Sequence, residues 1–214
     1  MNDVNSPRSL GRTGLFVLLA GAVVVGTLVA WVVWPRDSGQ VLVVGDSVTF
    51  LAAESIKDEI GRDGLTIRAY PGDRSTQLLT VLIQEVQRRE ESGGLDRVAV
   101  LAGYNDVLRD TEHPEDLAKM VDLSSRFECA VFLTVPAPPK WANRPAETEP
   151  FAALNDRLAK AVSAHPNVHL STVWAEAVAA SSPGDLVSDD GVHPIEHGKL
   201  VLGKAFADAL RENC

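Results

Sequence analysis

Hydrophobic residues in this chain follow two patterns. Short runs rich in apolar and β-branched residues are typical of strands buried in a sheet, and they lie at residues 41–44, 65–69, 98–102, 129–135 and 168–170. Between these runs, apolar residues recur at helical spacing. This spacing predicts a helix that begins at Pro114 and helices at residues 48–61, 75–91, 151–164, 173–180 and 195–211. Because strands and helices alternate, we expect an α/β fold with a parallel sheet of about five strands and helices on both faces.

The first strand leads directly into Gly45-Asp46-Ser47, and the first helix follows. Ser47 is therefore expected at the carboxyl edge of the sheet, where open α/β sheets bind ligands. A helix N-terminus at the same point favours negative charge. The alternative is that Asp46 and Ser47 only cap the helix.

A different hydrophobic pattern precedes the fold. Residues 15–34 are twenty residues without a charge, and a helix of that length spans roughly 30 Å, the thickness of a bilayer core. Trp31 and Trp34 end the run where membrane proteins place an aromatic belt. A cleaved signal peptide is the alternative, but its apolar region is shorter and ends in small residues.

We therefore predict an uncleaved anchor and four segments. These are a cytoplasmic tail at 1–14, a transmembrane helix at 15–34, a linker at 35–40 and a domain at 41–214. Two arginines before the helix and one after it predict that the N-terminus lies inside the cell and the domain outside the cytoplasm. We expect the cell to be bacterial. The linker reaches only about 20 Å, so the domain is expected close to the membrane.

Charge and composition exclude several classes of function. The formal net charge is −9; Arg8 and Arg12 against Asp3 give residues 1–34 a charge of +1, which leaves −10 for the rest. An acidic domain without a basic cluster is a poor nucleic-acid binder. The chain also lacks the glycine-rich loops of dinucleotide and P-loop sites, and nothing suggests a metal site, so no cofactor is expected.

Cys129 and Cys214 match no metal-ligand spacing. In an extracytoplasmic domain they are able to form one disulfide. The alternative is two unpaired thiols, and the sequence alone does not choose between them.

Two further polar segments follow predicted strands or precede the last helix: Gly103-Tyr104-Asn105-Asp106 and Asp190-Gly191-Val192-His193. A serine hydroxyl needs a base in order to act as a nucleophile at neutral pH, and histidine suits that task. The imidazole in turn needs a carboxylate to orient it. Asp190 lies three residues before His193, so one loop is able to supply both; Asp189 is the competing carboxylate, and the spacing favours Asp190.

A developing oxyanion needs donors that are already in place. The backbone N–H of Ser47 is one candidate, the backbone N–H of Gly72 is a second, and the side-chain amide of Asn105 is a third. The alternative for Asn105 and Asp106 is a simple turn.

Together these segments resemble the SGNH hydrolases, the GDSL-type esterase and lipase family, over about residues 40–211. The matches to its sequence blocks are Gly45-Asp46-Ser47, then Gly72, then Gly103-x-Asn105-Asp106, and finally Asp190-x-x-His193. Val48 stands where the family commonly has leucine, at a position expected to pack into the core. Four blocks in order make a far more specific signal than any block alone.

The resemblance implies a flavodoxin-like three-layer α/β/α sandwich. It implies Ser47 as the nucleophile, His193 as the base and Asp190 as the residue that orients it, with Ser47, Gly72 and Asn105 as the oxyanion hole. We therefore expect a membrane-anchored serine hydrolase that cleaves carboxylic esters or thioesters through an acyl-serine intermediate.

Two other functions are compatible with this sequence. One is an acyltransferase or deacetylase with the same three residues, acting on a cell-envelope glycan or lipid. The other is a non-catalytic, surface-anchored binding domain, against which the complete serine, histidine and aspartate set argues. The expected partners are a small acyl ester, a lipid or an acetylated glycan, together with the membrane itself.

Overall fold

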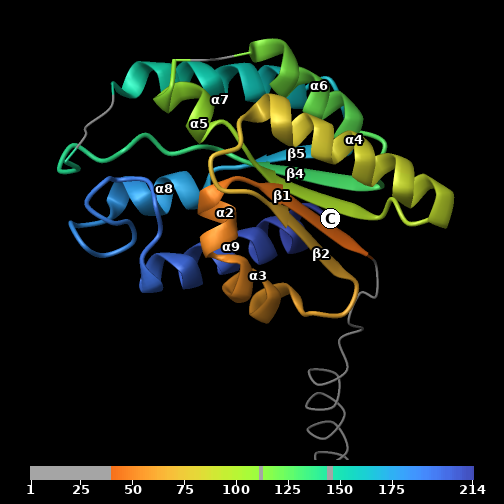
Figure 1. Cartoon of the computed structure of the whole chain (residues 1–214), viewed down its shortest axis with the longest axis horizontal. Coiled ribbons are helices and arrows are strands. Elements are labelled where there is room, and N and C mark those ends of the chain that lie inside the picture. Colours follow the sequence, from red (N-terminus) through yellow and green to blue (C-terminus); the bar gives the residue numbers. More distant parts are fainter. Residues whose placement is uncertain (1–39, 111–112, 144–146) are drawn as a thin grey trace, which may run out of the picture. The chain divides into compact units, whose positions relative to one another are not determined.

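Five parallel strands form one sheet in the order β2-β1-β3-β4-β5 in a computed structural model that describes residues 40–110, 113–143 and 147–214 (Figure 1). The strands are β1 (Val41–Gly45), β2 (Leu65–Ala69), β3 (Arg97–Leu101), β4 (Cys129–Leu133) and β5 (Val168–Ser171). This order is that of the flavodoxin-like doubly wound sheet, with a switch point between β1 and β3. All five predicted strands are confirmed within two residues at each end.

Helices cover both faces of the sheet (Figure 1). One layer holds α4 (Ser75–Ser92), α5 (Tyr104–Leu108), α6 (Pro114–Ser124) and α7 (Thr148–Val162). The other layer holds α2 (Ser47–Leu51), α3 (Ala53–Ile60), α8 (Val173–Ala180) and α9 (Glu196–Asn213). The described domain is therefore the three-layer sandwich that the family resemblance implied.

Two helices differ from the prediction. The single helix expected after Ser47 is divided at Ala52 into α2 and α3. The five-residue helix α5 was not predicted, because so short an element carries no apolar periodicity.

The core lies on both faces of the central strands. The side chains of Leu42, Val43 and Val44 in β1 are fully buried, as are those from Val98 to Leu101 in β3. In α9 the side chains of Leu202, Ala205 and Phe206 face this core. The same helix exposes 60% of Leu200, because two residues rotate the helix by about 200° away from the buried Leu202.

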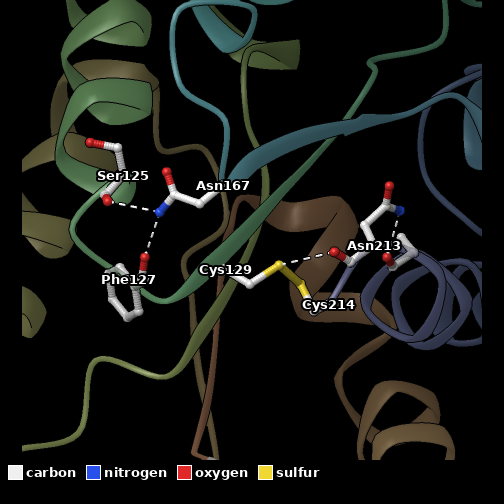
Figure 2. The surroundings of a disulfide bond; sticks show 7 residues. Ser125, Phe127, Cys129, Asn167, Asn213 and Cys214 are labelled. Atoms are coloured by element: carbon white, nitrogen blue, oxygen red, sulfur yellow. Dashed lines mark hydrogen bonds between the residues drawn. A yellow bond between two sulfur atoms is a disulfide. The ribbon is translucent and has the colours of Figure 1, made fainter.

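Cys129 at the start of β4 and Cys214 after the end of α9 form a disulfide (Figure 2). The structure therefore chooses between the two alternatives that the sequence left open. Beside it, the side-chain amide of Asn167 donates to the carbonyl oxygens of Ser125 and Phe127, at 2.9 and 2.7 Å, and so holds the turn that leads into β4.

None of the helices in the described ranges is sufficiently long and apolar to cross a bilayer. The predicted tail at 1–14, the predicted anchor at 15–34 and all of the predicted linker except Gln40 lie outside the described residues.

Candidate active site

Ser47 is the first residue of α2 and directly follows β1 at the switch point of the sheet. Asp46 starts the helix, because its Oδ1 accepts a hydrogen bond from the Val48 N–H at 3.0 Å. Gly45 permits the tight turn, since a Cβ there would lie 2.0 Å from the Thr49 hydroxyl oxygen. The capping alternative is thus correct for Asp46, and it leaves the Ser47 side chain available.

The structure brings Ser47, His193 and Asp190 into one hydrogen-bonded line. Ser47 Oγ lies 3.0 Å from His193 Nε2, and His193 Nδ1 lies 2.6 Å from Asp190 Oδ2. An ionised carboxylate only accepts, so Nδ1 carries the proton and donates it. Nε2 is then left as an acceptor that faces the Ser47 hydroxyl, which is the tautomer that a general base requires.

Asp190 is held as an anion by its own loop. Its Oδ1 accepts from the Ser188 hydroxyl at 2.7 Å and from the backbone N–H groups of Val192 and His193 at 2.8 and 3.0 Å. Partial burial raises the pKa of this carboxyl, but the hydrogen bonds from His193, Val192 and Ser188 outweigh burial and hold the pKa well below its usual range. Asp190, and not Asp189, contacts the imidazole.

Hydrogen bonds bring the three candidate oxyanion donors to the same edge of the sheet. The Tyr70 N–H donates to the Gly45 carbonyl at 3.1 Å, which ties the loop containing Gly72 to the residue two before Ser47. On the other side of that loop, Asn105 Nδ2 donates to the Asp73 carbonyl at 2.9 Å. This contact uses one of the two amide hydrogens of Asn105 and leaves the other free to donate.

Two backbone donors are also available at this edge. Within the described part of the chain, the N–H groups of Ser47 and Gly72 donate to no protein acceptor. Gly72 has a φ of +86°, a left-handed conformation that glycine adopts without a steric penalty. Ser47, Gly72 and Asn105 therefore each have, in the described structure, one N–H that is not used in a hydrogen bond, and all three lie at the same edge of the sheet.

Asp106 has a structural role. The alternative considered from the sequence, a simple turn at Asn105 and Asp106, did not include this role. Asn105 and Asp106 lie in helix α5, and the Asp106 carboxylate accepts from both the backbone N–H and the hydroxyl of Ser75 at 3.0 Å. Because Ser75 is the first residue of α4, this pair locks α5 against the start of α4 and thereby positions Asn105.

Asp46 is the most unusual titratable group beside the site. Its side chain is fully buried, and in the described residues its Oδ2 has no hydrogen-bond partner. Burial is the largest cause that raises its pKa, to about 7, while the Val48 N–H opposes the shift. A carboxyl with a pKa of about 7, which changes its protonation state near neutral pH, therefore lies next to the nucleophile candidate.

One group of possible metal ligands lies elsewhere in the described residues. Ligand atoms of His113, Glu115 and Asp116 lie within 4.8 Å of one another. The Asp116 carboxylate already accepts from the Thr76 hydroxyl at 2.7 Å and from Lys119 at 3.3 Å. Asp116 is therefore already engaged by two side chains, and this group shares no residue with the serine site.

Sequence reasoning missed the supporting residues. The Ser188 hydroxyl donates a hydrogen bond to Asp190, and the Ser75 hydroxyl donates one to Asp106. The Asp73 carbonyl accepts one from Asn105. A serine two residues before an aspartate in a glycine-containing loop was a signal for the first of these contacts. The other two join segments 31 and 32 residues apart and have no local signal.

A doubly wound sheet that carries a serine, histidine and aspartate line at its carboxyl edge is an arrangement typical of serine hydrolases. The chain belongs to the GDSL-like lipase/acylhydrolase family, whose profile matches residues 43–200. The protein is thus an enzyme of the GDSL-type ester hydrolase class, and the family resemblance found in the sequence is confirmed.

Solved structures share the fold at low sequence identity. A lipase/acylhydrolase from Enterococcus faecalis aligns with a TM-score of 0.66 and 19% identity over 81% of this chain and 96% of its own. A catalytic mutant of the acetylxylan esterase Axe2 from Geobacillus stearothermophilus aligns with a TM-score of 0.62 and 15% identity, over 80% of this chain and 94% of its own. The C-terminal catalytic domain of peptidoglycan O-acetyltransferase A from Streptococcus pneumoniae aligns with a TM-score of 0.63 and 15% identity, over 82% of this chain and 92% of its own. The comparison with curated protein sequences found no match.

Proposed function

We propose that this protein hydrolyses carboxylic esters through an acyl-serine intermediate, with Ser47 as nucleophile, His193 as general base and Asp190 as the residue that orients His193. The observation that supports this most directly is the continuous line from Ser47 Oγ through both ring nitrogens of His193 to Asp190, with heavy-atom distances of 3.0 and 2.6 Å. Hydrogen-bond reach between nucleophile, base and orienting group is the geometry that this chemistry needs.

In the first half of the reaction, Ser47 Oγ attacks the carbonyl carbon while its proton passes to His193 Nε2. The carbonyl electron pair moves to oxygen, where the N–H groups of Ser47 and Gly72 and the Asn105 amide stabilise the negative charge. When the intermediate collapses, the carbon–oxygen bond to the leaving group breaks, and the alkoxide takes the proton from Nε2 and departs as an alcohol.

In the second half, water attacks the acyl-serine and gives a proton to His193 Nε2. The new tetrahedral intermediate collapses, the bond to Ser47 Oγ breaks, and Oγ takes the proton back. A carboxylic acid leaves and the enzyme is restored. Asp190 stays ionised throughout, since its pKa lies well below its usual range, and it stabilises the imidazolium that forms in each half.

The test is Ser47→Ala, which removes the attacking atom. We expect turnover of a chromogenic acetate ester to fall by at least about 10⁴-fold, and we expect covalent labelling by a fluorophosphonate probe to disappear. The thermal unfolding midpoint should stay close to that of the wild type. Ser47 is partly exposed, and the variant loses one side-chain hydrogen bond, to His193, among those of the described structure. Turnover retained by a folded variant contradicts the proposal, and a wild type that the probe does not label favours the non-catalytic binding domain.

Acyl transfer is a second candidate, because the pneumococcal domain with the same fold is named a peptidoglycan O-acetyltransferase. A transferase forms the same acyl-serine and differs in its acceptor, which is a sugar or lipid hydroxyl in place of water. Incubation of an acyl donor with added alcohols and glycans, followed by mass spectrometry of the products, separates the two. Free acid as the dominant product supports hydrolysis, and acylated acceptor as the dominant product supports transfer.

We further propose that the domain is extracytoplasmic and anchored in the membrane through residues 15–34. Two observations support this location: the twenty uncharged residues of that segment and the Cys129–Cys214 disulfide, which persists in oxidising compartments. A lipid or an acetylated cell-envelope glycan is then within reach as substrate. Protease added to intact cells should remove the domain, and full protection contradicts this orientation.

A further inference from the structure

Four exposed hydrophobic side chains lie in the segments that carry proposed groups of the site. The described residues include seven exposed large hydrophobic side chains, and four of them are Phe50, Leu51, Tyr70 and Leu108. They are 39% to 51% exposed. Single exposed apolar residues are ordinary on protein surfaces, but a group of them marks a site of interaction.

Helical spacing places these side chains beside the reacting groups. Phe50 and Leu51 lie three and four residues after Ser47 in α2, so they share its face of the helix, while Val48 and Thr49 point into the core. Leu108 lies three residues after Asn105 in α5 by the same rule. Both short helices therefore present a polar group of the site and, one turn later, an exposed apolar side chain.

Tyr70 lies in the loop that is hydrogen-bonded to Gly45, just before α2, and to Asn105 in α5. Its backbone N–H donates to the Gly45 carbonyl at 3.1 Å, and it lies two residues before Gly72. In Figure 1, α2, α5 and the loop between β2 and α4 lie at the same end of the sheet. We define Phe50, Leu51, Tyr70 and Leu108 as the apolar rim of the site.

We propose that the apolar rim binds an apolar chain of the ester substrate and makes this enzyme prefer esters with such chains over acetate esters of short alcohols. This inference rests on the proposed ester hydrolysis and deepens it. The occupant follows from continuity, because a substrate whose carbonyl lies against Ser47 and the Asn105 amide must extend its chains over the side chains next to them. Two aliphatic side chains among the four favour a flexible hydrocarbon chain, which gains from burial of each methylene.

The experiment measures kcat/KM for two series of soluble esters, below their aggregation concentrations. One series lengthens the acyl chain from acetate to octanoate on a fixed alcohol, and the other lengthens the alcohol on a fixed acetate. For the wild type we expect kcat/KM to rise in at least one series, by up to about fourfold for each methylene that becomes buried. The series that rises identifies which chain occupies the rim.

The variants are Phe50→Gln and Tyr70→Gln, singly and together, with Phe50→Leu as the conservative partner. We expect the double variant to lower the ratio of kcat/KM for the longest ester to that for the shortest by about tenfold or more, and we expect Phe50→Leu to retain most of it. Ile83→Ala in α4 and Leu200→Ala in α9 are matched controls, since both remove exposed apolar side chains outside the rim. They should leave the ratio as in the wild type.

Each outcome decides a separate point. A wild type that turns over no ester and is not labelled at Ser47 overturns the proposed function, and the inference falls with it. A wild type that is labelled and active, with the same chain-length ratio in rim variants and controls, overturns the inference alone. The rim variants are also assayed on substrates in lipid vesicles. If they lose activity only there, and keep the wild-type ratio for soluble esters, the inference is again overturned and the rim is a contact with lipid surfaces.

Discussion

Asp190 uses each of its carboxylate oxygens for a different task. Oδ2 accepts from His193 Nδ1, while Oδ1 accepts from the Ser188 hydroxyl and from two backbone N–H groups. The second set fixes the carboxylate before any substrate arrives. The imidazole is therefore oriented by a group that cannot itself rotate away, which is the condition for a base to be in place at the moment of attack.

Asp190→Asn separates the charge of this residue from its shape. The amide is able to keep the loop contacts, but it offers no negative charge to the imidazolium and favours the wrong tautomer. We expect kcat/KM for a chromogenic ester to fall by roughly 10²–10⁴-fold. Asp189→Asn is the matched control and should stay within a few-fold of the wild type. Equal losses in the two variants contradict the assignment of Asp190.

Asp46 gives the domain a pH dependence that can be measured. Its carboxyl has a pKa of about 7 in the folded protein against a usual value of 3.8, because it is buried with one oxygen unpaired in the described structure. The unfolded chain therefore loses this proton at lower pH than the folded one. The contribution of Asp46 to stability falls as pH rises from about 4 to about 7, and it is constant above that range.

Asp46→Asn removes this titration and keeps a side-chain oxygen for the Val48 N–H. We expect the free energy of unfolding of the wild type, relative to the variant, to fall by about 3 kcal/mol between pH 5 and pH 8. Urea unfolding of both proteins across this range checks it. Parallel pH profiles for the two proteins contradict the raised pKa.

At the scale of elements, helix α9 holds the loop that carries Asp190 and His193. The Ile195 N–H donates to the Leu186 carbonyl at 3.0 Å, and the Ser188 N–H donates to the His193 carbonyl at 2.8 Å, so the loop closes on itself directly before α9. Gly198 in the first turn of α9 lies against the same carbonyl, because a Cβ there would be 1.8 Å from the Leu186 oxygen. The loop is thus clamped by a helix that packs on α3.

Gly198→Ala should open this clamp. We expect the added methyl group to push α9 from Leu186, to lower the free energy of unfolding by about 1–3 kcal/mol, and to lower kcat/KM by more than tenfold through displacement of His193. Leu200→Ala, two residues further along the same helix on its exposed side, is the control and should change neither quantity appreciably. Wild-type activity and stability in Gly198→Ala contradict the clamp.

For the described domain as a whole, the disulfide joins the end of α9 to the start of β4 across a sequence separation of 85 residues (Figure 2). It therefore fastens the far end of the helix whose first turn holds the loop with Asp190 and His193. In the chain-entropy description, a cross-link over a loop of this length stabilises the folded state by about 4–5 kcal/mol, mainly by restricting the unfolded chain.

Cys214→Ser removes this cross-link. We expect the free energy of unfolding in urea to fall by about 2–5 kcal/mol, and we expect a reducing agent to have a similar effect on the wild type and none on the variant. Alkylation of both thiols in the native, unreduced wild type contradicts the disulfide.

The sequence by itself determined the elements and the order of the chemical groups. Continuous apolar runs identified all five strands, and most helices followed from their spacing, because these patterns record the local environment of each residue. Ser47, Gly72, Asn105, Asp190 and His193 were all named from short segments, since each motif combines a residue type with a local backbone position.

Only the tertiary structure decided which distant groups meet. It brought Ser47 within 3.0 Å of His193, 146 residues further along the chain, and it paired Cys129 with Cys214. It also exposed Leu200 and placed α2, α5 and the loop between β2 and α4 at the same end of the sheet. Local periodicity carries no information on such contacts, because they depend on strand order and on how whole helices pack across the sheet.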